Sequence, residues 1–440
     1  MFYTHRLAEK RLEETLNNKD RNRDTILVEG ARQVGKTSLV KHLCSSRPHL
    51  WLDLEKEKVF LRKIDATNAF EEFSDLLAAE KNFVPGQGRI LVIDEAQESR
   101  LLGGYVRYFK ETWENQTVVL LGSLMARLFR KDVRYPVGRT HSIKIYPFTF
   151  EEFLLAFNEE LLLQKIKAWE PEKPLSPPFH QKALQSFQVY LTIGGLPEVL
   201  QWHVHKKNWE EKLKDLAYGY TEDFKRVEGE EKSALFELTF KRIAQTLGSP
   251  SKLSTIIEAN QPGYRLLPDM INLLENWMLV FKIEIETPTA PGVSRIPPKR
   301  YLFDHGIRHV FSPVSLRISE VVGEETRLGS TYLGGIFENA VLNEIKPWET
   351  QKTVVWRKAV NSSEIDFLFT KNKMVIPIEV KATGKMNRRH FSSLLEYLNF
   401  SGGKFGLLVS AGGGAVYSEK GKSIYQTPFY AIRQSLDLLR

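Results

Sequence analysis

The chain has 440 residues, of which 42% are hydrophobic and 26% charged, with a formal net charge of +8. The length predicts about three domains, and the absence of any apolar run near the roughly 18 residues of a membrane span excludes an integral membrane protein. The single cysteine, Cys44, excludes an internal disulfide framework or multi-cysteine zinc site, and residues 1–24 lack the apolar core of a secretory signal. We therefore expect a cytoplasmic protein with no membrane partner.

Two proline-rich stretches, at 170–178 and 287–298, mark the expected domain boundaries, because proline interrupts helices and removes backbone donors. The predicted domains are 1–170, 171–290 and 291–440. Short apolar runs that alternate with helical patterns indicate a parallel sheet with crossover helices in the first domain; they lie at 25–28, 90–93 and 118–121. The second domain is mostly helical in pattern. Strand-like runs return in the third, which predicts another α/β or α+β domain.

A phosphate-binding loop is predicted at the start of the first domain. Residues 26–43 read ILVEGARQVGKTSLVKHL, an apolar strand followed by the pattern G-x-x-x-x-G-K-T and an amphipathic helix. Glycines stand where side chains would stop the backbone N–H groups from turning toward phosphate. Lys36 is expected to reach the β and γ phosphates of ATP, and the Thr37 hydroxyl to coordinate Mg²⁺. The predicted loop contacts are Gly30, Ala31, Arg32, Gln33, Val34, Gly35, Lys36, Thr37 and Ser38.

Acidic residues end a later strand of the same domain. Residues 89–97 read RILVIDEAQ, which delivers Asp94 and Glu95 to the edge of the sheet where ligands bind in open α/β folds. Asp94 is expected to hold Mg²⁺ directly or through water, and Glu95 to orient and deprotonate the water that attacks the γ phosphate. The next strand ends in Ser123, which either senses the γ phosphate or is an ordinary serine at a strand end.

Three segments of the third domain form one chemical pattern. GGIFENAVLNE carries Glu338, SEIDFLF carries Asp366, and IPIEVKATGK carries Glu379 and Lys381. Period-two alternation places Glu379 and Lys381 on one face of a strand. Phosphodiester cleavage needs carboxylates that converge on a divalent cation, Mg²⁺ or Mn²⁺, with a lysine near the attacking water. Asp366, Glu379 and Lys381 form the pattern D-x(12)-E-x-K. The alternative interpretation is that these acids and this lysine lie on a solvated strand face without a catalytic role.

These motifs resemble the bacterial and archaeal AAA-type ATPases whose C-terminal domain, of unknown function, is similar to PD-(D/E)XK restriction endonucleases. The resemblance covers nearly the whole chain and also includes LLGSL, VGR and YLTIGGLPEVL, at 120–124, 137–139 and 190–200. It implies catalytic roles for Glu338, Asp366, Glu379 and Lys381, with metal at Asp366 and Glu379. It also suggests Arg139 as the arginine that completes the ATP site, although a surface arginine fits the same position. Because such sites often lie between subunits, a homo-oligomer is a plausible form.

The resemblance further implies a winged helix in the second domain, and residues 251–285 have a fitting pattern. The expected DNA-reading helix at 266–279 carries Asp269 and Glu275 but no lysine or arginine, whereas groove-reading helices present basic or amide side chains. We interpret this helix as a packing or coupling element.

The basic excess lies in the third domain. Residues 291–440 hold 21 Lys and Arg against 13 Asp and Glu, whereas the first 290 residues balance 41 against 41. This is either a solvated basic surface or the footprint of nucleic-acid binding. Lys381, Lys385, Arg388 and Arg389 are the expected phosphate contacts.

Three functions follow from these patterns. The leading hypothesis is an ATPase that controls a metal-dependent nuclease-like domain acting on nucleic acid. The alternative is an ATP-dependent switch whose C-terminal domain binds a partner or nucleic acid without cutting. A small-molecule kinase is the third reading, but no acceptor-site motif is evident.

Overall fold

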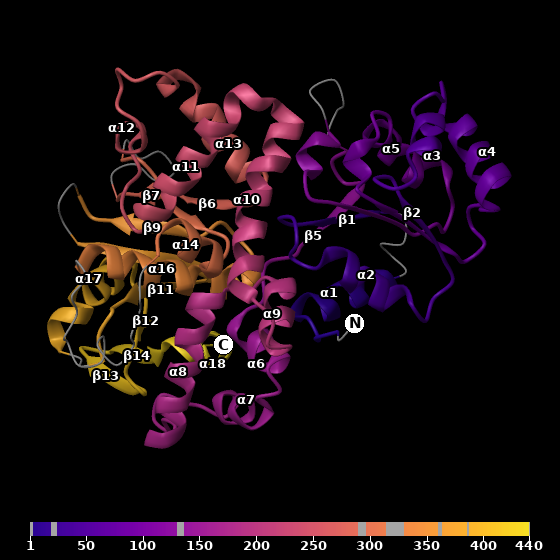
Figure 1. The fold of residues 1–440 in the computed structure, drawn as a ribbon. Helices are drawn as coiled ribbons and strands as arrows, with labels where there is room; N and C mark the ends of the chain where they lie inside the picture. The colour runs from indigo at the N-terminus through magenta and orange to yellow at the C-terminus, as the bar shows by residue number, and fades with distance from the viewer. Residues whose placement is uncertain are drawn as a thin grey trace. The chain divides into compact units, whose positions relative to one another are not determined.

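A computed structural model describes residues 3–18, 24–129, 136–288, 296–313, 330–359, 363–384 and 387–439. The chain forms two compact units, one of residues 1–147 with 276–278, and one of residues 148–275 with 279–440. Figure 1 shows the elements of both. Among the described residues, no helix has the length and apolar character needed to cross a membrane.

The first unit is built on a five-stranded sheet in which every pair of neighbours is parallel. The strand order is β2-β3-β4-β1-β5. The strands are β1 (Thr25–Glu29), β2 (His49–Asp53), β3 (Ile90–Asp94), β4 (Val118–Gly122) and β5 (Thr140–Lys144). Of the three interior strands, β3 and β4 are buried along their whole length, as continuous apolar runs require. This confirms the predicted parallel α/β fold.

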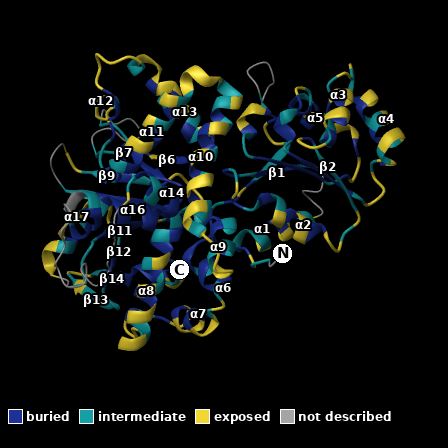
Figure 2. Cartoon of the chain, in the orientation of Figure 1, coloured by how far each residue is buried: buried dark blue, intermediate teal, exposed yellow. Residues whose placement is uncertain are grey.

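Helices cover this sheet and supply an aromatic core. They are α1 (Leu7–Asn17), α2 (Lys36–Cys44), α3 (Lys58–Ile64), α4 (Phe70–Lys81) and α5 (Leu102–Thr112). Phe70, Phe73 and Phe109 gather around Trp113, with ring centroids 5.0–6.2 Å from the indole. In Figure 2, α4 carries yellow, exposed turns, which matches a helix that buries one face.

The second unit begins with helices. They are α6 (Phe150–Ala156), α7 (Glu160–Lys167), α8 (Pro177–Ile193), α9 (Pro197–Val204), α10 (Trp209–Glu228), α11 (Ser233–Gln245), α12 (Leu253–Ile256) and α13 (Leu267–Asn276). The unit starts at Phe148, so it includes α6 and α7, which the sequence assigned to the ATPase domain. The reason is aromatic packing: the Phe150 ring lies 5.1 Å from Phe187 and 5.7 Å from Tyr190 on α8. The second predicted boundary, near 290, lies outside the described residues.

A short antiparallel pair, β6 (Val280–Ile283) and β8 (Lys299–Leu302), follows the three helices α11 to α13. This order of elements agrees with the pattern expected at 251–285, and the winged helix stays a prediction. The helix α13 buries Leu267, Met270, Ile271 and Leu274, so it serves packing, as its lack of basic residues indicates.

The rest of the second unit is a mixed seven-stranded sheet of order β13-β14-β12-β11-β10-β9-β7. Its strands are β7 (Ile285–Glu286), β9 (Val354–Arg357), β10 (Glu364–Lys371), β11 (Met374–Val380), β12 (Phe405–Ser410), β13 (Ala415–Glu419) and β14 (Lys422–Pro428). The accompanying helices are α14 (His305–Phe311), α16 (Ser330–Ile345), α17 (Ser392–Ser401) and α18 (Ile432–Leu438). A mixed sheet with helices agrees with the predicted α/β class, while the endonuclease-like identity of this domain stays a prediction.

A buried carboxyl group joins α16 to α6 and α8. Glu344 Oε1 accepts hydrogen bonds from the Phe150 N–H at 2.8 Å and from the Tyr190 hydroxyl at 3.0 Å. Burial raises the pKa of Glu344 to about 8, although these two bonds oppose the shift. The folded protein therefore keeps a proton on Glu344 at neutral pH, which the unfolded chain releases above its ordinary pKa near 4.5.

This raised pKa predicts an alkaline loss of stability. Because the folded state binds the extra proton, Glu344 stabilises fully below about pH 4.5, and its contribution falls as pH rises toward 8. Glu344→Gln keeps an acceptor at Oε1 and removes the titration. The parent therefore loses stability as pH rises, and the variant does not. Between pH 5 and pH 8.5 we expect the difference in the free energy of unfolding, variant minus parent, to rise by about 2–4 kcal/mol. Denaturant unfolding at both pH values measures this; exposed Glu160→Gln is the control, and an equal pH dependence in all three proteins would contradict it.

Candidate functional site

The predicted phosphate loop lies between β1 and α2, and its backbone explains its glycines. Gly35 has φ 90° and Gln33 φ 67°, both in the left-handed region. A Cβ on Gly30 would overlap the Ile145 carbonyl oxygen, so only glycine fits where the loop passes β5. The left-handed turns at Gln33 and Gly35 and the close approach at Gly30 agree with a phosphate-binding loop.

The Lys36 side chain closes this loop from inside. Its ammonium donates to the carbonyl oxygens of Gly30 at 3.0 Å and Ala31 at 2.8 Å. Burial lowers the pKa of Lys36 to about 8, while the nearby carboxylates Glu95 and Asp94 oppose the shift. A buried cation aimed at the loop carbonyls is placed to bind phosphate oxygens.

The two groups predicted to hold Mg²⁺ are in direct contact. The Thr37 hydroxyl donates to Asp94 Oδ2 at 2.9 Å, although 57 residues separate them in sequence. Burial raises the pKa of Asp94 despite the bonds that it accepts from Thr37 and from the Glu95 N–H. A hydroxyl and a carboxylate beside a phosphate cradle are the oxygen ligands that Mg²⁺ takes. These residues fit the ion.

Glu95 follows Asp94 in a left-handed conformation, with φ 51°. Its Oε2 accepts a hydrogen bond from the Gln97 amide at 2.5 Å, and burial raises the pKa of Glu95. Gln97, which is buried, thus fixes the carboxylate expected to act as a base. Sequence reasoning missed Gln97, although it stands in the quoted segment RILVIDEAQ.

The structure places the other predicted ATP-site residues differently. Ser123 follows β4 at the edge where the loop lies, since β4 pairs with β1 as far as Gly122 and Glu29. Arg139 instead precedes β5, at the opposite edge, and its guanidinium donates to Glu111 on α5 at 2.6 Å. The structure therefore does not bring Arg139 to the loop of its own chain.

The C-terminal pattern converges as the sequence predicts. Phe367 pairs with Ile378 across β10 and β11, so Asp366 and Glu379 follow directly opposite each other. Asp366 Oδ2 accepts the Val380 N–H at 2.8 Å, and the Lys381 ammonium lies 2.5 Å from Glu379 Oε1. Burial, with nearby acids, raises the pKa of Asp366 well above its usual range, and that of Glu379 to about 6.

A lysine that sequence reasoning missed lies among these acids. Lys299, which is only 2% exposed, places its ammonium 2.7 Å from Glu364, 3.1 Å from Glu338 and 3.7 Å from Asp366. Burial opposes its charge, but the carboxylates outweigh burial and raise its pKa. The Tyr301 hydroxyl, two residues along β8, donates to Glu338 at 2.6 Å. The signal was alternation in KRYL, which puts Lys299 and Tyr301 on one face.

These contacts decide whether the acidic cluster fits a divalent metal. Four carboxylates, Glu338, Glu364, Asp366 and Glu379, meet three cations, since Arg357 also pairs with Glu364. Among the described residues, Glu338, Asp366 and Glu379 do not form a group of three in which one ligand atom from each lies within 4.8 Å of the other two. Glu379 Oε2 is buried with no hydrogen-bond partner in the described structure, but Lys299 neutralises its neighbours. The acids as arranged fit the ammonium groups of Lys299 and Lys381 better than a divalent cation.

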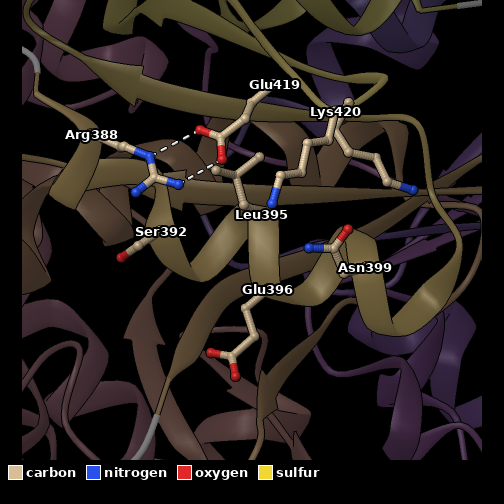
Figure 3. Close-up of a pocket in the computed structure, with 8 residues that line it drawn as sticks. Arg388, Ser392, Leu395, Glu396, Asn399, Glu419 and Lys420 are labelled. Atoms are coloured by element: carbon tan, nitrogen blue, oxygen red, sulfur yellow. Dashed lines mark hydrogen bonds and ion pairs between the residues drawn. The ribbon is translucent and has the colours of Figure 1, made fainter.

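Of the four expected phosphate contacts, Lys381 lies at the acidic cluster, whereas Arg388 lies at a different feature. A cavity of about 330 Å³ is lined by α17 and the β13–β14 hairpin, and Arg388 borders it in Figure 3. Arg388 donates to both oxygens of Glu419, at 2.9 and 2.6 Å, so an acid already holds its guanidinium. This cavity lies on the α17 side of the sheet. Ile365 of β10 packs toward α17, so alternation along the strand directs Asp366 to the opposite face, away from the cavity. Arg389 follows in the same turn. Lys385 lies outside the described residues.

Comparison with known proteins finds three family models that match separate stretches of the chain. Residues 22–154 match the model of an AAA domain, and residues 184–317 and 333–430 match two domains of unknown function. The nucleotide site and the first match together define an AAA-type ATPase domain that binds ATP. No curated protein matches the chain.

Two solved structures show limited likeness. A Walker-type ATPase of Pyrococcus abyssi is 18% identical, with 69% of this chain and 94% of that chain covered and a TM-score of 0.45. The Orc1 protein of Aeropyrum pernix, solved with DNA, is 14% identical, with 71% and 93% covered and a TM-score of 0.29. At such scores these likenesses carry no argument about function.

Proposed function

We propose that the protein hydrolyses ATP at the loop of residues 30–38 and uses the hydrolytic cycle to switch its second unit between states. The contact of Thr37 with Asp94, beside the buried Lys36, is the observation that carries this proposal. It gathers a hydroxyl, a carboxylate and an ammonium at one phosphate cradle, as ATP hydrolysis requires. Mg²⁺, when bound with ATP, supplies neutralisation of phosphate charge.

The chain's own residues have distinct tasks in this proposal. Lys36 exchanges its bonds to the Gly30 and Ala31 carbonyls for phosphate oxygens, and Thr37 with Asp94 holds the ion. Glu95 accepts the proton of the attacking water, and its raised pKa favours that role. Gln97 positions the Glu95 carboxylate through their hydrogen bond.

Glu95→Gln tests the hydrolytic assignment. The amide keeps the shape of the side chain but accepts no proton, so we expect the rate of ATP hydrolysis to fall about 10²- to 10⁴-fold while ATP affinity stays near that of the parent. Phosphate release and fluorescent-nucleotide titration measure the two quantities. Glu98→Gln, in the next turn and paired with Lys58, is the matched control. Unchanged turnover in Glu95→Gln would remove Glu95 from the mechanism.

For the C-terminal domain we propose binding without cutting. The ammonium of Lys299 among the carboxylates supports this reading, because a divalent ion would have to displace it. The raised pKa of Lys381, where carboxylates overcome the opposing effect of burial, also makes this lysine a poor base. The basic excess of residues 291–440 favours nucleic acid as the partner. Self-association stays a prediction.

A metal-dependent nuclease is the second candidate, favoured by the convergence of Glu338, Asp366, Glu379 and Lys381. Incubation with single- and double-stranded DNA and RNA, with Mg²⁺ or Mn²⁺ and with or without ATP, separates the two. We expect binding that weakens with salt and no cleavage. Cleavage by the parent that disappears in Asp366→Ala would establish the nuclease instead.

A further inference from the structure

Three side chains outside the nucleotide site meet on the surface of the first unit. They are His5, just before α1, Glu9 in the first turn of α1, and His42 in the last turn of α2. One ligand atom from each lies within 4.8 Å of the other two. Two imidazoles and a carboxylate are a ligand set that zinc takes in proteins.

The spacing of these atoms also agrees with that of metal ligands. His5 Nδ1 lies 3.2 and 3.3 Å from the two Glu9 oxygens, and His42 Nε2 lies 3.5 Å from Glu9 Oε1. Charge-assisted N–H···O bonds are shorter, about 2.7–2.9 Å. Ligands about 2.0–2.1 Å from a tetrahedral zinc ion stand about 3.3–3.4 Å apart, from the edge of the tetrahedron. The separations of His5 and His42 from Glu9 agree with that edge, and the two histidine nitrogens lie within 4.8 Å of each other.

Neighbouring groups hold two of the three ligands in place. The Tyr3 ring stacks on the His42 imidazole with centroids 3.8 Å apart, and its hydroxyl donates to Glu9 Oε2 at 3.1 Å. The Arg6 N–H donates to the same oxygen at 3.2 Å. His42 also lies in the last turn of α2, where the helix dipole favours a cation. Such outer contacts orient the ligands of protein metal sites.

We propose that His5, Glu9 and His42 bind a divalent transition metal of the zinc class, with water in the fourth position. His5 is 78% and His42 40% exposed, so an ion has access from solvent, while Glu9 is 17% exposed and anchors the site. The ion fastens the segment before α1 to the helix that begins at Lys36. This site is independent of the proposed hydrolytic function.

The experiment titrates Zn²⁺ into tag-free, chelator-treated full-length protein by calorimetry, with Co²⁺ absorption as a second readout. We expect one equivalent per chain, a four-coordinate Co²⁺ spectrum, and a higher melting temperature with Zn²⁺. His5→Gln and His42→Gln are each expected to weaken binding about 10-fold or more, given that losing even outer-shell partners costs that much. His205→Gln, an exposed histidine outside the cluster, is the control and should bind as the parent does.

Equal zinc affinity and stoichiometry in the parent and in the double variant His5→Gln, His42→Gln would place the ion elsewhere and overturn the proposal. An octahedral Co²⁺ spectrum, or no heat of binding, would overturn it too. Because His5 is exposed, its substitution tests the site without disturbing the core.

Discussion

Lys36→Met is expected to abolish the stabilisation that ATP gives to the parent, while leaving the free protein at least as stable. The ammonium is buried and its pKa is lowered to about 8, so removing the charge relieves a desolvation penalty in the free state. The methionine cannot bind phosphate. Losing one partner of a buried charged contact costs about 2–5 kcal/mol, which is about 30-fold to several thousand-fold in ATP affinity.

Thermal unfolding with and without Mg²⁺–ATP measures both effects at once. At ATP 100-fold above its dissociation constant the parent should gain about 2.7 kcal/mol, and the variant nearly nothing. Lys41→Met is the matched control, since Lys41 is exposed on the same helix and contacts Trp51. An equal ATP-induced shift in parent and Lys36→Met would refute the role given to the loop lysine.

Lys299→Met is expected to lower the free energy of unfolding by about 3–5 kcal/mol at neutral pH, because it leaves buried carboxylates without their counter-ion. The carboxylates of the variant should recover by taking up protons, so the loss should shrink as pH falls. Millimolar Mn²⁺ or Ca²⁺ should restore part of the stability, because the ion can occupy the space and charge that the ammonium leaves.

Arg300→Met is the control for this substitution. Arg300 is the next residue of β8 and is also buried. Its side chain points to the other face of the strand, where it pairs with Glu275 at 3.1 Å. Arg300→Met should lower the free energy of unfolding, and Mn²⁺ or Ca²⁺ should not restore it. Denaturant unfolding across a metal series measures both variants. If Mn²⁺ raises the free energy of unfolding of the parent as much as that of Lys299→Met, the lysine does not occupy the cation position. That result would favour the metal-dependent nuclease.

The nucleotide site follows from sequence because its chemistry is local. One strand, one loop and one helix place Gly30 to Thr37, and the two glycines stand where a side chain would collide, at Gly30, or where the left-handed backbone favours glycine, at Gly35. Asp94 and Glu95 follow for a similar reason, since strands of a parallel sheet end at a common edge. Gln97 lay within the same motif, but its bond to Glu95 depends on the left-handed turn at Glu95, which composition does not signal.

By itself the sequence determined the class of both sheets, the phosphate loop and the convergence of Asp366 with Glu379, because each depends on residues close in sequence or on strand alternation. Only the tertiary structure decided what those residues meet. Lys299 reaches Glu338 from 39 positions away, and Arg139 stands at the far edge of its sheet beside Glu111. Such partners depend on strand order and register, which long-range packing sets. For that reason the sequence motif alone does not reveal that the Lys299 ammonium lies among the acids of the cluster, where it pairs with Glu338 and Glu364.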